Sequence, residues 1–164
     1  MIDDVTIRRL APLLALVALA AACGLTTTSP SGGPTPTPTP LRGDMSAIQA
    51  ALALRGATIH AAVSGDAGCP SVPGIHQNAA RFELSLAGDA GQPSEVFLFR
   101  WRRASDFAAA EQAFSDCVDE YTAGIAGDVP IDGLEVEPWR AYGPGWSPDL
   151  LELLESALRD VGGG

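Results

Sequence analysis

Hydrophobic and polar residues follow three different patterns along the 164-residue chain. Two adjacent arginines precede an uncharged run, rich in leucine and alanine, over residues 10–22. Residues 25–41 are then rich in threonine and proline. From residue 44 to residue 161, short apolar stretches alternate with polar ones, and a stretch of this length is typical of one folded domain.

Within this domain the hydrophobic pattern predicts a helix, three strands, a helix, a strand and a final helix. Apolar residues recur at three- and four-residue steps in the helical segments and at every second position in most strands. The segment 95–101 is apolar on both faces and should be a central strand. The predicted elements are a helix from Ser46 that ends at Gly56, strands over 58–63, 82–87 and 95–101, a helix over 105–121, a strand over 134–142 and a helix from Pro148.

This order of elements predicts an α+β domain of two layers, with a mostly antiparallel sheet of about four strands and helices packed on one face. The short loop between 82–87 and 95–101 predicts an antiparallel hairpin. Arg81, Glu83 and Ser85 alternate with apolar residues and give the first of these strands a wet side. The glycines at 162–164 form a short tail.

A basic start, a short apolar run and small residues describe a secretory signal peptide over 1–22. Cys23 follows at once, so this segment resembles the lipobox-type signal of bacterial lipoproteins. The resemblance implies cleavage before Cys23, a diacylglycerol on its thiol, frequent acylation of the new amine with a fatty acid such as palmitate, and a place on the extracytoplasmic face of the bacterial cell membrane. A plain cleaved signal is the alternative. A membrane-spanning helix needs about 20 apolar residues, and this run is shorter.

Residues 23–43 are expected to form the lipidated N-terminus and a linker. Proline at every second position from 34 to 40 prevents a helix and favours an extended, semi-rigid spacer. O-glycosylation of Thr35, Thr37 and Thr39 is an alternative role for such a segment.

The charge of the chain limits its partners. The formal net charge is −10, and all ten basic residues are arginines. Such an acidic protein is unsuited to binding nucleic acid or to lying flat on anionic lipid.

Two cysteines remain in the domain, and outside the cytoplasm an even pair indicates a disulfide. Cys117 lies on the apolar side of the predicted helix over 105–121, whereas Cys69 lies in a turn-rich loop. The sequence therefore predicts a Cys69–Cys117 bond, with two buried thiols or a metal or redox role as the alternatives.

Residues with catalytic potential are few. His60 lies on a predicted strand and His76 in a loop, and neither has a nearby nucleophile or carboxylate in the sequence. No paired metal-ligand spacing, phosphate loop or dinucleotide motif is present. We therefore expect no catalytic residues, no metal, no cofactor and no enzymatic activity.

Three large aromatic residues and an arginine cluster between residues 139 and 146. Trp139, Arg140, Tyr142 and Trp146 are of the types that dominate binding hot spots. They are equally suited to filling the core beneath the final helix, and burial of all three rings would exclude the binding role. This segment is therefore the candidate functional surface in the sequence.

These observations lead to a functional expectation. In pattern, the domain resembles small lipid-anchored or secreted bacterial proteins whose functions are not assigned. We expect an envelope lipoprotein whose domain binds an unknown protein or small molecule without catalysis. An accessory or structural subunit of an envelope complex is the first alternative, and an enzyme with an unrecognised site is the second.

Overall fold

The computed structural model describes residues 43–88 and 91–162. The chain divides after Thr37 into two units, and every described residue belongs to the second. The signal over 1–22, Cys23 and the linker up to residue 42 lie outside the described residues. In the described ranges, no helix combines the length and the apolarity that crossing a membrane requires.

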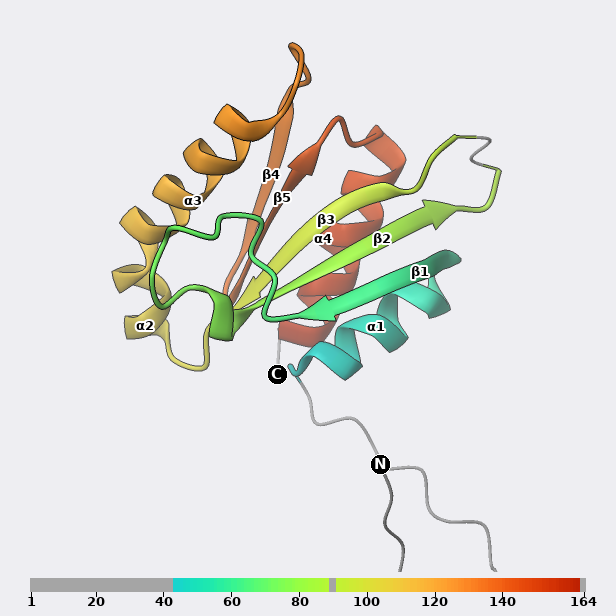
Figure 1. Ribbon diagram of the computed structural model, residues 1–164. Coiled ribbons are helices and arrows are strands. Elements are labelled where there is room, and N and C mark those ends of the chain that lie inside the picture. The colour runs from blue at the N-terminus through green and yellow to red at the C-terminus, as the bar shows by residue number, and fades with distance from the viewer. Residues whose placement is uncertain (1–42, 89–90, 163–164) are drawn as a thin grey trace, which may run out of the picture. The chain divides into compact units, whose positions relative to one another are not determined.

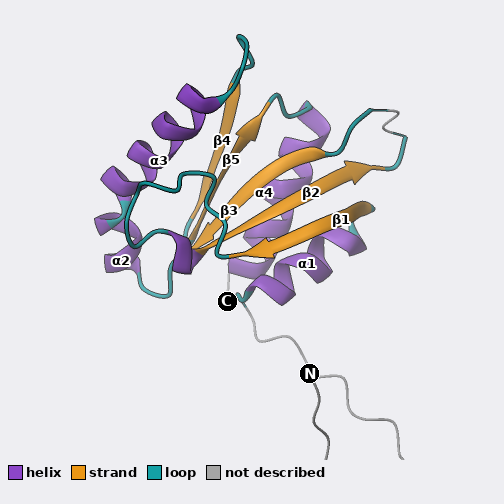
Figure 2. Cartoon of the chain, in the orientation of Figure 1, coloured by secondary structure: helices purple, strands orange, loops and turns teal. Residues whose placement is uncertain are grey.

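The described residues form an α+β domain built on one antiparallel sheet, as predicted (Figures 1 and 2). The strand order is β1-β2-β3-β5-β4. The elements are α1 (Met45–Leu54), β1 (Ala57–Ser64), the 3-10 turn η1 (His76–Asn78), β2 (Ala79–Leu86), β3 (Ser94–Arg100), α2 (Ala104–Ala109), α3 (Glu111–Gly124), β4 (Ile131–Val136), β5 (Trp139–Pro144) and α4 (Pro148–Gly162).

The sheet has five strands where the sequence predicted about four. The segment 134–142, predicted as one strand, is divided by a turn at Glu137 and Pro138 into β4 and β5, which pair with each other. Proline has no N–H to donate to a ladder, so a strand does not continue through this position. Apolar and polar residues alternate on both sides of the turn, so the pattern did not indicate that the chain reverses its direction there.

The predicted hairpin of β2 and β3 is confirmed, and β3 is the middle strand of the sheet. Its residues alternate between two apolar environments. Val96 and Leu98 belong to one buried cluster, whereas Phe97 and Phe99 belong to another on the opposite face. This explains why the strand is apolar on both sides.

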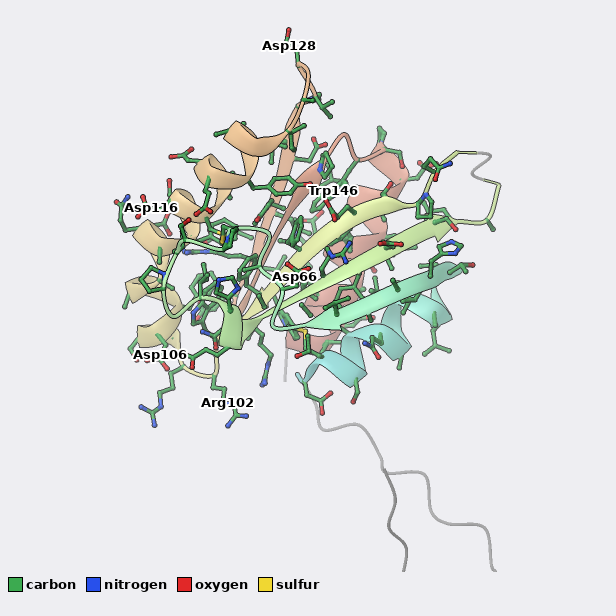
Figure 3. All side chains as sticks on the ribbon, viewed as in Figure 1. Asp66, Arg102, Asp106, Asp116, Asp128 and Trp146 are labelled. Atoms are coloured by element: carbon green, nitrogen blue, oxygen red, sulfur yellow. A yellow bond between two sulfur atoms is a disulfide. The ribbon has the colours of Figure 1, made fainter. Side chains whose placement is uncertain are left out.

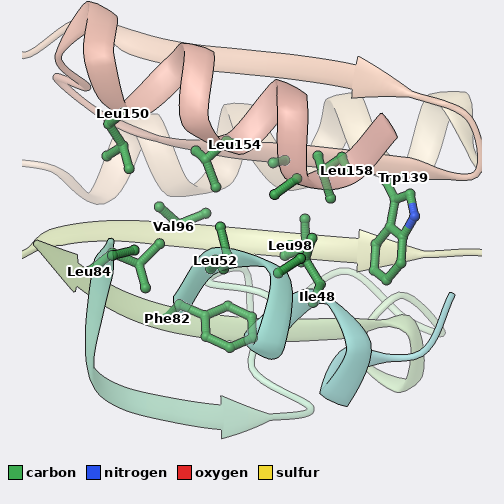
Figure 4. Close-up of a cluster of buried hydrophobic side chains, with 14 of the residues drawn as sticks. Ile48, Leu52, Phe82, Leu84, Val96, Leu98, Trp139, Leu150, Leu154 and Leu158 are labelled. Carbon is green, nitrogen blue, oxygen red and sulfur yellow. The ribbon is translucent and has the colours of Figure 1, made fainter. Parts of the chain in front are cut away.

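The larger core lies between the sheet and helices α1 and α4 (Figure 4). The apolar stripes that the sequence predicted for these two helices point into it. Ser147 caps α4, because its Oγ accepts a hydrogen bond from the N–H of Leu150 at 3.2 Å. The buried members of the stripes are Ile48, Ala51, Leu52, Leu150, Leu154, Ala157 and Leu158.

The helices cover both faces of the sheet, which corrects the expectation that they pack on one face. Helices α2 and α3 and the loop after β1 cover the second face, opposite α1 and α4 (Figure 1). The doubly apolar β3 and the aromatic residues of β5 need cover on both sides. The predicted helix over 105–121 is also divided at Ala110 into α2 and α3, although its apolar side packs inward as expected.

Candidate functional site

The aromatic segment proposed as a binding surface is buried, so that prediction is wrong. The exposed fractions are 0% for Trp139, 2% for Arg140, 1% for Tyr142 and 6% for Trp146. The first three lie on β5, which is paired on both sides, by β3 and β4. The Trp146 indole packs in the larger core and donates to the carbonyl of Glu95 at 2.9 Å. The alternative role in core packing is therefore the correct one.

Arg140 is the one buried charged residue in the described part of the chain, and aromatic rings enclose it. Its guanidinium carbon lies 4.2 Å from the ring centre of Phe107, 5.4 Å from that of Phe114 and 5.6 Å from that of Trp101. Glu111 and Glu135, both largely exposed, pair with the guanidinium from the solvent side. This arrangement holds α2 and α3 against β5.

The predicted disulfide is confirmed. Cys69 and Cys117 are bonded, with their Cα atoms 5.1 Å apart, and both side chains are fully buried. The bond fixes the loop after β1 to α3. The hydroxyl of Tyr142 also holds this loop by donating to the carbonyl of Ala67.

Gly68 is the residue that allows this loop to lie so close to the sheet. Its φ is +74°, and a Cβ at this position would lie 2.8 Å from the Phe97 ring and 2.9 Å from the Tyr142 hydroxyl. A residue with a side chain would be strained there and would also clash. The loop is therefore seated directly on the second face of the sheet.

This loop and α3 leave part of the second face uncovered. Among the helices of the described residues, none lies over it where β1 and β2 run side by side (Figure 1). Val63 is 40% exposed at this point. We call the uncovered area the open face, and it comprises His60, Ala61, Val63, Asp66, Arg81, Glu83, Ser85 and Glu95.

Arg81 is the centre of the open face. Its Nε lies 2.9 Å from Asp66, and its Nη1 lies 3.1 Å from Glu83 and 3.2 Å from Glu95. Burial lowers the pKa of Arg81, but the hydrogen bonds to Asp66 and Glu95 outweigh this effect and raise the pKa above its ordinary value. Three carboxylates surround one guanidinium, so the group carries a formal charge of −2.

Glu95 connects the open face to α3. Its second carboxylate oxygen accepts a hydrogen bond from the hydroxyl of Tyr121. Burial and this hydrogen bond raise the pKa of Tyr121 well above its ordinary value, because both favour the neutral hydroxyl that donates to Glu95. The carboxylates nevertheless remain accessible, with side-chain exposures of 35% for Asp66, 39% for Glu83 and 30% for Glu95.

Two open depressions flank the disulfide-bonded loop beside the open face. One, of about 370 Å³, lies between the loop and the end of β1 and includes Val63, Asp66 and His76. The other, of about 520 Å³, lies between the loop and α3 and includes Glu120 and Tyr121. Asp66 marks the loop in front of the sheet (Figure 3). Of the residues that the structure describes, Asp66 is the one acidic residue that lines the first depression, and the second depression adds the carboxylate of Glu120 beside the loop.

The two histidines lie in different elements. His60 is on β1, with its Nε2 2.8 Å from the Ser85 hydroxyl. His76 is in η1, and its Nδ1 donates to the carbonyl of Gly65 at 3.2 Å. Within 43–88 and 91–162, no group of three or more His, Cys, Asp or Glu side chains is placed to hold a metal ion.

The residue pattern of β2 predicted part of the open face. Arg81, Glu83 and Ser85 were expected on a wet side of their strand. The contributions of Asp66 and Glu95 depend on the loop conformation and on the pairing of Glu83 with Glu95 across the hairpin. The alternation of polar with apolar residues in β2 was the available signal, but it did not indicate which neighbouring elements would leave these side chains uncovered.

No protein-family model matches this chain, and neither a curated protein nor a solved structure is significantly similar to it.

Proposed function

We propose that this protein is a bacterial envelope lipoprotein whose domain binds a cationic partner without catalysing a reaction. The lipobox-like residues before Cys23 and the proline-rich residues after it support the anchor. A single acyl chain holds a protein on a membrane only marginally, whereas two or more acyl chains anchor the protein stably. The domain is then held at the extracytoplasmic face of the membrane while it binds its partner.

The open face is the main observation that supports the proposed binding role. Polar and charged side chains converge there on an uncovered part of the sheet, and the Arg81 group leaves two negative charges unbalanced. Glu120 adds a further carboxylate beside the loop. A protein segment that carries arginine or lysine has the complementary charge.

The anchor gives the first prediction. Wild-type protein should partition into the detergent phase of a phase-separating detergent, because its acylated N-terminus is apolar. Cys23→Ala should either move the protein to the aqueous phase or leave 1–22 uncut. Mature protein that begins at another residue and carries no acyl mass, as measured by intact mass spectrometry, would exclude the anchor.

The open face gives the second prediction. A ten-residue oligoarginine peptide should bind the full mature chain in detergent, and an oligoglutamate peptide of the same length should not. The double variant Glu83→Gln, Glu95→Gln should weaken binding about tenfold, because each partly exposed charge contributes about 0.5–1 kcal/mol. Isothermal titration calorimetry at two salt concentrations measures both effects, and higher salt should weaken binding.

A matched control separates a local site from attraction to the overall negative charge. Asp116 lies on the outer side of α3, where it accepts a hydrogen bond from Gln112 (Figure 3). Asp116→Asn removes the same type of charge away from the open face and should change the affinity less than twofold. An equal loss per charge in Asp116→Asn and in the double variant would refute the proposed site.

A further inference from the structure

Strand β1 forms one edge of the sheet and carries no charged side chain. Each of the other four strands contains at least one charged residue. These residues are Arg81 and Glu83 in β2, Glu95 and Arg100 in β3, Asp132 and Glu135 in β4, and Arg140 in β5. The uncharged strand is thus located at an edge, where proteins usually place charges to prevent pairing with other chains.

The backbone of β1 has groups available for such pairing. The N–H of Gly65 donates to the carbonyl of Ala79 in β2 at 2.9 Å. In an antiparallel ladder the residues that bond to the neighbour alternate, so Ala61 and Val63 also face β2. Ala62 and Ser64 therefore direct their N–H and C=O groups away from the sheet, and both residues are exposed.

The two edges of the sheet differ in their protection. Strand β4, at the opposite edge, carries Asp132 and Glu135, which would repel the same strand of a second molecule. Strand β1 has an irregularity between Ile59 and Ala61, which leaves the regular part of the edge at 61–64. Proline and charged residues are both missing from that part.

We propose that β1 pairs antiparallel with β1 of a second copy of this chain and joins two sheets into one. A two-fold arrangement would let Ala62 and Ser64 of each copy bond to the same segment of the other. A neutral strand offers no charge with which to select a charged segment of another protein. In a chain of net charge −10, it also provides a place where two copies meet without opposing carboxylates. This inference rests on the outward backbone groups of Ala62 and Ser64, neither of which belongs to the open face, and it is independent of the anchor.

Sedimentation analysis of the full mature chain in detergent tests the proposal. Wild type should show a concentration-dependent monomer–dimer equilibrium. Ala62→Pro should raise the dissociation constant at least tenfold, because it removes an outward N–H from each copy without removing a bond to β2. Ala62→Thr keeps this N–H and should dimerise like wild type. Circular dichroism and thermal unfolding establish that both variants are folded.

Cross-linking in intact membranes provides a second measurement, which also decides the question if Ala62→Pro fails to fold. Ala62→Cys should form a disulfide-linked dimer on mild oxidation. Val129→Cys, a control at a position that is 43% exposed and outside the sheet, should not. Wild type that is monomeric at every concentration, equal dimerisation of wild type and folded Ala62→Pro, or equal cross-linking at positions 62 and 129 would overturn the proposal.

Discussion

Replacement of Arg140 by alanine is expected to lower the free energy of unfolding by about 3 kcal/mol or more, because it leaves a cavity among buried aromatic rings. The guanidinium is 2% exposed and lies closest to the ring of Phe107. Its removal would eliminate the side chain of β5 that lies against Phe107 of α2 and Phe114 of α3. Urea unfolding followed by circular dichroism measures the loss.

Two further variants test the physical reason. Arg140→Met fills the same volume with apolar atoms and should lose less than about 1.5 kcal/mol, since buried charges are often replaceable by apolar residues of similar size. Arg159, whose side chain is 66% exposed and pairs with Glu155 within α4, provides the control. Arg159→Ala should cost at most about 0.5 kcal/mol. Equal losses in Arg140→Ala and Arg159→Ala would contradict the buried role of Arg140.

Loss of the disulfide is expected to have an effect of similar size. The double variant Cys69→Ala, Cys117→Ala should lower the free energy of unfolding by about 2–5 kcal/mol. The bond joins residues 48 positions apart in sequence and, in its absence, the unfolded chain gains conformational freedom. Urea unfolding of the oxidised wild type and of the double variant gives the difference.

A reducing agent supplies the control for this prediction. It should destabilise the wild type and leave the double variant unchanged. An oxidised wild type that unfolds at the same urea concentration as the double variant would contradict a stabilising role for the bond. Since the bond also holds Asp66 near Arg81 through the loop, we expect the double variant to bind the oligoarginine peptide more weakly.

The sequence predicted the secondary structure better than it predicted how the helices and strands pack against one another. The hairpin, the central β3 and the apolar stripe of α4 follow from periodicity, which depends on residues close in the chain. The turn at Pro138 was missed because apolar alternation continues on both sides of it. The packing of helices on both faces of the sheet was not predicted. β3 is apolar on both sides, but the sequence pattern does not show on which face each helix packs.

The functional residues illustrate the same limit. Trp139, Tyr142 and Trp146 have side chains that serve equally well in a core or at an interface. Trp139 and Tyr142 of β5 pack in the two buried clusters on opposite faces of the sheet, and Trp146, which follows β5, packs in the larger core. The open face depends on what α3 and the disulfide-bonded loop leave uncovered. The exposure of this face results from tertiary packing, and it cannot be predicted from the residue types alone.

The most direct test of the proposed binding role is to locate the bound peptide on the domain. In ¹H–¹⁵N spectra of the full mature chain in detergent, the oligoarginine peptide should produce its largest amide shifts around the open face, at Val63, Asp66, Arg81, Glu83 and Glu95. Shifts centred on the outer side of α3 near Asp116, or spread evenly over all acidic residues, would contradict the binding role of the open face.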